Sequence, residues 1–143
     1  MDTVDQIICG GNHTFALTRD GSVYSWGYNE FGQLGIGNNQ NQNVPQKVLD
    51  LENVDQIICG FGHTYALMKD GSMCSWGWNN SGQLGIGNNQ NQNVPQRVED
   101  FENVDQIIWK GNHTFALMKD GYVYSWGWNV HGQLGIGNNQ SQY

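Results

Sequence analysis

The sequence is poor in positive charge, in proline and in cysteine, and each shortage narrows the possible classes of protein. Its 143 residues include 6 Lys and Arg against 13 Asp and Glu, for a formal net charge of -7. A surface of this sign repels phosphate, so we expect no nucleic-acid groove. No apolar stretch approaches the roughly 20 residues that span a bilayer, and no signal-like segment opens the chain. We therefore expect a soluble, intracellular protein that binds neither membrane nor nucleic acid.

The cysteines are too few to form a disulfide framework. Cys9 and Cys59 stand at the same position of an internal repeat, and Trp109 stands there in the third copy. A position that accepts either Cys or Trp is typical of apolar packing rather than of a metal or cofactor ligand. We predict no disulfide, metal site or cofactor from these residues.

The glycines and aromatic residues, which are abundant, recur at a fixed interval. The words "SWGYNEFGQLGIGNNQ" from Ser25 return almost unchanged from Ser75 and from Ser125. A period of about 50 residues is typical of propellers and solenoid arrays. The chain is accordingly divided into repeats 1–50, 51–100 and 101–143, the last one shorter, within one propeller-type domain.

Local signals in each repeat favour short β-strands, as the first copy illustrates. Residues 4–9 are apolar and partly alternating, residues 13–18 alternate, and residues 22–27 return after an Asp-Gly turn. Residues 44–48 form a fourth short strand, in which Pro45 is confined to an edge or a strand start. About four antiparallel strands are the size of one propeller blade, so the sequence predicts an all-β fold with three blades.

Three motifs follow one another in every repeat. They read G-x-x-H-T-x-A-L, then D-G-x-V-Y-S-W-G-x-N, then G-Q-L-G, with minor departures such as Lys110 in place of the first glycine. This pattern resembles the repeat of the regulator of chromosome condensation family, over essentially the whole chain. The resemblance implies a β-propeller, usually closed by seven blades. The motif positions that we interpret as structural are His13, Trp26, His63, Trp76, His113 and Trp126.

For each motif that resembles a catalytic or metal site, a structural role explains the residues better than catalysis does. One histidine per repeat, after a glycine turn, is predicted to cap the backbone at the entrance of a strand, and zinc would require all three to converge. Asp20 and its counterparts each precede Gly in a hairpin turn, which explains them fully. The segment "GIGNNQ" lacks the Lys-Ser/Thr ending of a phosphate loop. We predict that the protein is not an enzyme.

Three blades leave two sheet faces without a neighbour, which is a large apolar surface for a soluble protein. The interpretation we prefer is that a second copy covers both faces, so that a homodimer closes a six-bladed ring. The alternative is a fragment of a longer propeller, natural or engineered, including an engineered chain with no evolved partner.

The loop after each "SWG" differs between the repeats, with Glu30 and Phe31 in the first copy and Val130 and His131 in the third. Such variation on a fixed scaffold is either drift or a partner-facing surface. The partner-binding residues predicted on the second interpretation are Phe31, Phe61, Trp78, Trp128 and His131. Tyr28, Trp78 and Trp128, aromatic in every copy, have packing between blades as the alternative role.

The function predicted from these features is that of a non-enzymatic protein-interaction scaffold that assembles through its open blade faces and binds another protein through variable loops. The family resemblance adds an alternative, because some members are nucleotide-exchange factors for a small GTPase and some bind chromatin. An exchange factor needs a protruding element, and the three repeats carry no insertion that would provide one.

Overall fold

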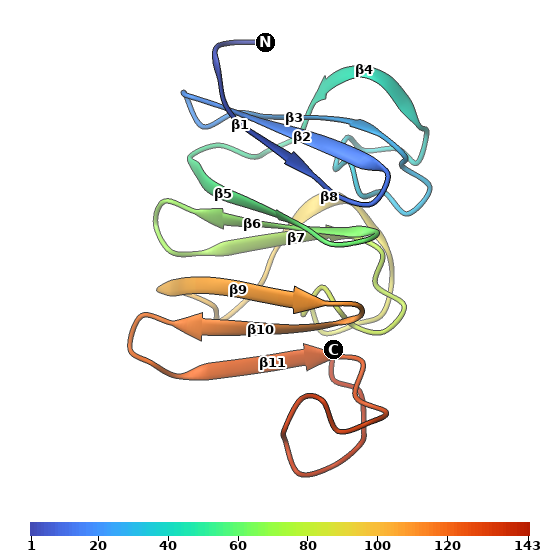
Figure 1. Ribbon diagram of the computed structural model, residues 1–143, viewed down its shortest axis with the longest axis vertical. Helices are drawn as coiled ribbons and strands as arrows, with labels where there is room; N and C mark the ends of the chain where they lie inside the picture. Colours follow the sequence, from blue (N-terminus) through green and yellow to red (C-terminus); the bar gives the residue numbers. More distant parts are fainter.

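The computed structural model describes residues 1–143 and consists of three antiparallel β-sheets stacked along the long axis of the molecule (Figure 1). Blade 1 contains β1 (Val4–Cys9), β2 (His13–Thr18), β3 (Val23–Gly27) and β4 (Gln42–Lys47), hydrogen-bonded in that order. Blade 2 contains β5 (Val54–Cys59), β6 (His63–Met68), β7 (Met73–Gly77) and β8 (Gln92–Arg97), again in chain order. Blade 3 contains β9 (Val104–Lys110), β10 (His113–Met118) and β11 (Val123–Gly127). The predicted all-β class is confirmed, and the structure has no helix that is long and apolar enough to cross a membrane.

The fourth strand of a blade lies at the edge of its sheet, as the proline predicts. β4 begins earlier than expected, because its pairing with β3 starts at the pair Gly27 and Gln42. In blade 3 this edge is reduced to an isolated bridge between Gly127 and Gln142. Pro45 lacks a backbone N–H and is tolerated here because an edge strand has one unpaired side.

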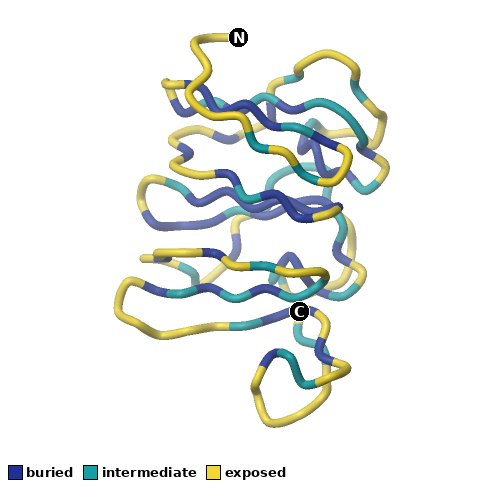
Figure 2. The backbone as a smooth tube through the Cα atoms, in the orientation of Figure 1, coloured by how far each residue is buried: buried dark blue, intermediate teal, exposed yellow.

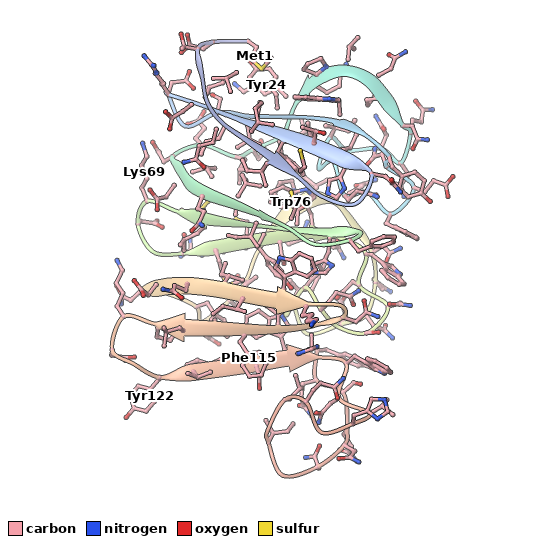
Figure 3. All side chains as sticks on the ribbon, in the orientation of Figure 1. Met1, Tyr24, Lys69, Trp76, Phe115 and Tyr122 are labelled. Atoms are coloured by element: carbon pink, nitrogen blue, oxygen red, sulfur yellow. The ribbon has the colours of Figure 1, made fainter.

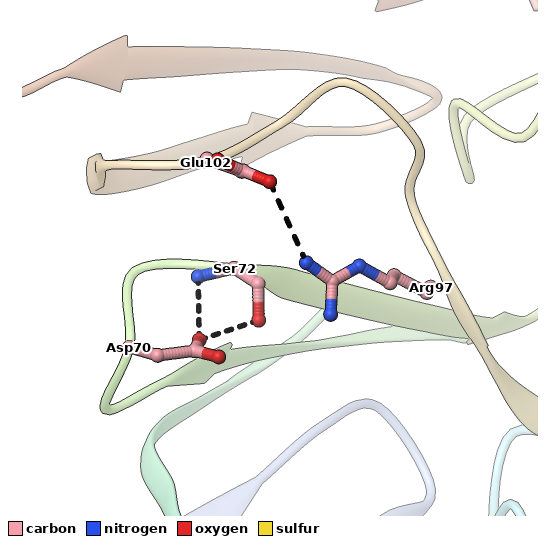
Figure 4. A network of polar contacts seen from close by, with 4 residues as sticks. All are labelled: Asp70, Ser72, Arg97 and Glu102. Atoms are coloured by element: carbon pink, nitrogen blue, oxygen red, sulfur yellow. Dashed lines mark hydrogen bonds and ion pairs between the residues drawn. The ribbon is translucent and has the colours of Figure 1, made fainter.

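The hairpin turns carry the chemistry expected of an Asp-Gly pair. Gly21 has a φ of 84°, a left-handed conformation that a residue with a Cβ rarely adopts. The carboxylate of Asp70 accepts hydrogen bonds from the backbone N–H and the hydroxyl of Ser72, at 2.9 and 2.6 Å (Figure 4). These bonds favour the charged form and lower the pKa of Asp70. Turn structure therefore accounts for this aspartate.

The blades pack through opposite faces of their sheets. Alternation along β2 and β3 directs Phe15, Leu17 and Val23 toward blade 2, where they meet Ile57 and Trp76 in one buried cluster. A second cluster, with the equivalent residues one repeat further on, joins blades 2 and 3. Figure 2 shows that buried residues are more concentrated in the middle blade than in the two outer blades. Each blade thus has one face that fits the preceding blade and another that fits the next.

A tryptophan hydrogen bond repeats at both junctions. The indole N–H of Trp76, which lies between the first two sheets (Figure 3), donates to the carbonyl of Gln33 at 2.8 Å. Trp126 donates in the same way to the carbonyl of Gln83 at 2.9 Å. A Cβ at Gly35 would lie 2.8 Å from the indole nitrogen of Trp76, so the glycine makes room for the ring. The Trp and the second glycine of the G-Q-L-G motif therefore act together at each junction.

The two outer faces of the stack expose the residues that are buried at the junctions. On blade 1, Ile7 is 57% exposed, whereas its counterpart Ile57 is 3% exposed. On blade 3, Val123 is 59% exposed, whereas its counterpart Val23 is fully buried. Trp26, which has no preceding blade to receive its indole, is only partly buried. The outer faces thus carry the strand residues of the internal junction without their partners, although residues 1–143 contain no counterparts of Val48 and Leu51 on blade 3.

Candidate interaction surface

The two ends of the blades differ in chemistry. We define the aromatic end as the turns 10–12, 60–62 and 110–112 together with the loops 28–41, 78–91 and 128–141. Of the 6 basic and 13 acidic residues of the chain, only Glu30 and Lys110 lie in these segments. The remaining charges belong to the strands, the opposite turns and the linkers between blades, including the exposed pair Arg97 and Glu102 at 4.0 Å (Figure 4). The aromatic end is therefore nearly uncharged in an otherwise acidic protein.

All five residues predicted to bind a partner lie in the segments that form the aromatic end. Phe31 and Trp78 stack with ring centroids 5.1 Å apart and planes inclined by 19°. Trp128 and His131 make an edge-to-face pair at 5.5 Å in blade 3. Phe61 is 63% exposed. The five residues thus form two aromatic pairs and one exposed ring, and their role in binding remains a prediction.

Two glycines, which have no side chain, leave room for two of these aromatic rings. A Cβ at Gly62 would lie 3.1 Å from the ring of Phe31, and a Cβ at Gly11 would lie equally close to the ring of Phe61. The first repeat reads Gly11-Asn12 and the second reads Phe61-Gly62. The glycine therefore occupies the first of these two positions in repeat 1 and the second in repeat 2, and each glycine lies against an aromatic ring. This change of position is the feature of the sequence that indicates the arrangement of the rings.

The turns of all three blades surround a pocket of about 600 Å³ at the aromatic end. Its aromatic walls are Phe61, Trp78 and Trp109, and Cys9 and Cys59 lie beside them at the ends of β1 and β5. Burial raises the pKa of Cys59 to about 12, with a smaller contribution from nearby Cys9, so this thiol stays protonated at neutral pH. Trp109 packs against the cluster between blades 2 and 3, as predicted, and the pocket that it also lines was not predicted.

The repeated histidines lie behind this surface and are packing residues. His13 and His63 are buried, and burial lowers the pKa of each to about 4, so both imidazoles are neutral at neutral pH. Neither ring makes a hydrogen bond through its nitrogens, so the predicted backbone capping is wrong for these two residues. A Cβ at Gly60 would lie 2.3 Å from the ring of His63, which explains the glycine at that position. Where Lys110 replaces this glycine, His113 is only partly buried.

The histidines do not converge, and no group of three or more His, Cys, Asp or Glu side chains lies close enough together to hold a metal ion.

Three stacked antiparallel sheets, joined by repeated Trp and Gly contacts, define a β-propeller repeat protein. A family model of the RCC1-like domain matches residues 1–143, and the chain belongs to this family. The resemblance inferred from the repeat motifs is confirmed.

Individual relatives support the same assignment. The structure is similar to that of Prp20p from Saccharomyces cerevisiae, with a TM-score of 0.85 and 26% identity over 97% of this chain and 36% of that one. The ultraviolet-B receptor UVR8 of Arabidopsis thaliana is 53% identical over 45 residues, or 32% of this chain and 10% of the receptor. The serine/threonine-protein kinase Nek9 of Xenopus laevis is 51% identical over 47 residues, or 33% of this chain and 5% of the kinase. The chain thus spans about a third of the solved relative and much less of the other two.

Proposed function

We propose that this chain is a non-enzymatic protein-interaction scaffold that assembles with a second copy through its outer blade faces and presents the aromatic end to a partner protein. The observation that carries the proposal is the match between the two outer faces. The outer face of blade 3 corresponds to the face of blade 1 that packs against blade 2. The outer face of blade 1 corresponds to the face of blade 2 that packs against blade 1.

The internal junctions predict the contacts between copies. Blade 1 of one copy would lie against blade 3 of the other, with the indole of Trp26 donating to the carbonyl of Gln133, as Trp76 donates to Gln33. The backbone N–H of Val4 would donate to the carbonyl of Gly121, because the equivalent bond between Val104 and Gly71 measures 3.0 Å. A twofold axis makes both contacts at once, which closes six blades without an open face.

Apolar burial supplies the driving force for this assembly. Ile7 and Val123 are more than half exposed in the single chain and would become buried in the ring. Complete burial of such a side chain contributes about 1.5–3 kcal/mol, and each twofold pair buries two of each. This gain is reduced by the rotational and translational entropy lost on association, so the affinity must be measured.

Light scattering of the 143-residue chain tests the assembly. We expect a mass of twice 16.0 kDa for the unaltered protein. Val123→Asp places a charge at the junction and should give a monomer, as should Ile7→Asp on the other face. Val130→Asn is the matched control, because Val130 is exposed at the aromatic end and Asn80 is its counterpart. A monomeric or open-ended unaltered protein would overturn the closed pair.

Relatives support protein binding as the general role. The solved relative Prp20p is described by its binding properties to Gsp1p and histones. For this chain we propose a protein partner at the aromatic end and no nucleotide-exchange activity, because the three repeats share one loop length. An exchange assay with small GTPases checks the second point, and acceleration above the uncatalysed rate would contradict it.

A further inference from the structure

The pocket at the aromatic end is asymmetric, although the repeats around it are nearly identical. Positions 11, 61 and 111 carry Gly, Phe and Gly, and positions 9, 59 and 109 carry Cys, Cys and Trp. Phe61 therefore stands between two turns that have glycine at the equivalent position, and Trp109 lines the same pocket. The residues that break the repeat are thus among those that line the pocket.

The lining of the pocket indicates what it can hold. Aromatic rings, thiols and glycines form most of it, and no lining residue carries a charge. The volume of about 600 Å³ falls in the usual range for ligand pockets and exceeds that of a single side chain. An anion would lose its hydration there without gaining a partner, and a cation would gain only the faces of the rings, so the lining favours an apolar group.

One polar group at the edge of the pocket favours a peptide over a free hydrocarbon. Asn112 lines the pocket, and its backbone carbonyl already accepts a hydrogen bond from the N–H of Trp128 at 2.8 Å. The side-chain amide of Asn112 has both a donor and an acceptor, which is the set that a peptide group requires. An apolar side chain in the hollow would bring its own backbone toward this amide.

We propose that the pocket holds an aliphatic or aromatic anchor side chain from an uncharged, extended segment of the partner protein. This inference rests on the proposed function and specifies the chemistry of the partner. The charge distribution supports it, because the aromatic end offers an incoming segment only Glu30 and Lys110 as charged neighbours. Anchors of this kind, buried among aromatic side chains, commonly dominate the affinity of a protein interface.

The repeats supply variants that test the pocket with residues already present at equivalent positions. Phe61→Gly introduces the residue found at positions 11 and 111, and Trp109→Cys introduces the residue found at positions 9 and 59. The double variant removes two of the three aromatic walls. Tyr122→Ser is the matched control, because it removes an aromatic side chain that is 68% exposed at the opposite end, where Ser22 and Ser72 are the counterparts.

The probes are short blocked peptides that differ only in a central Leu, Phe, Lys or Asp, titrated into the full chain and followed by NMR. We expect the Leu and Phe peptides to shift the amide signals of Gly11 and Gly111 and the indole signals of Trp78 and Trp109 saturably. The double variant should weaken this binding at least tenfold, and Tyr122→Ser should leave it unchanged.

Three results would overturn the proposal. They are no saturable shift with the Leu or Phe peptide, equal binding to the double variant, and a preference for the Lys peptide, which would indicate a cation site instead. Light scattering of the same samples reports the assembly separately. Absence of peptide binding by the unaltered protein, with an unchanged mass, therefore refutes the pocket without refuting the scaffold.

Discussion

The same substitution at three equivalent tryptophans separates the contribution of the blade junctions from that of the repeat sequence. We consider Trp26→Phe, Trp76→Phe and Trp126→Phe. Trp76 and Trp126 are 0% and 4% exposed and donate across a junction, whereas Trp26 is only partly buried and has no acceptor from a preceding blade. If the junctions provide the stability, the same change should cost more at Trp76 and Trp126 than at Trp26.

The magnitude follows from the contacts of Trp76. Loss of a buried hydrogen bond costs about 1 kcal/mol here, because the carbonyl of Gln33 keeps the hydroxyl of Thr64 at 3.2 Å as a donor. The smaller ring also removes apolar atoms and leaves a void, which costs roughly 1–2 kcal/mol more. We expect Trp76→Phe to lower the free energy of unfolding by roughly 2–3 kcal/mol, Trp126→Phe by a similar amount, and Trp26→Phe by less than about 1 kcal/mol.

Urea unfolding followed by circular dichroism measures these differences, at protein concentrations low enough to keep the chain monomeric. At high concentration Trp26→Phe should weaken the dimer, since its indole would then lack the acceptor provided by the second copy. Equal losses from all three substitutions in the monomer would refute the reasoning, as would a change below about 0.5 kcal/mol for Trp76→Phe, which is the size expected of an ordinary surface substitution.

Three further predictions concern buried groups. Burial lowers the pKa values of His13 and His63 to about 4, so between pH 6.5 and 4 the unfolded chain binds more protons than the folded chain. The free energy of unfolding should therefore fall by up to about 1.4 kcal/mol for each residue and each pH unit as the pH is lowered through this range. A urea midpoint that stays constant over this range would contradict the burial. Gly60→Ala should destabilise by about 1–3 kcal/mol in thermal unfolding, because its Cβ would overlap the ring of His63, whereas Lys110→Ala at the equivalent position should change little. Tyr65→Phe, which introduces the residue of the other two copies, should cost about 1–2 kcal/mol in urea unfolding by removing a buried hydroxyl bonded to the next blade, and an unchanged midpoint would show that bond to be unimportant.

Local features of the fold were predictable from the sequence, because the information lies within a few residues. The strands at residues 4–9 and 13–18 have the predicted bounds, and the Asp-Gly pairs form the predicted turns. Pro45 predicted a strand at an edge or a strand start, and its strand lies at an edge of the sheet. Each of these depends on alternation or on allowed backbone angles, which a short stretch of sequence specifies.

Features that depend on how blades meet were predicted less well. Trp109 was correctly assigned to packing, because it packs against the cluster between blades 2 and 3, but the pocket that it lines with Phe61 and Trp78 was not predicted. The buried His13 was identified as structural, but the predicted bond from its ring to the backbone is absent. The pocket depends on the rotation between sheets, which no single repeat encodes.

Hydrogen exchange of the tryptophan indole N–H groups tests most directly whether the outer faces pair as the inner ones do. The indoles of Trp76 and Trp126, which are bonded within the chain, should exchange slowly at every protein concentration. The indole of Trp26 should exchange rapidly in dilute solution and become protected as the concentration rises and the second copy binds. Rapid exchange of Trp26 at high concentration, with the other two protected, would contradict the account.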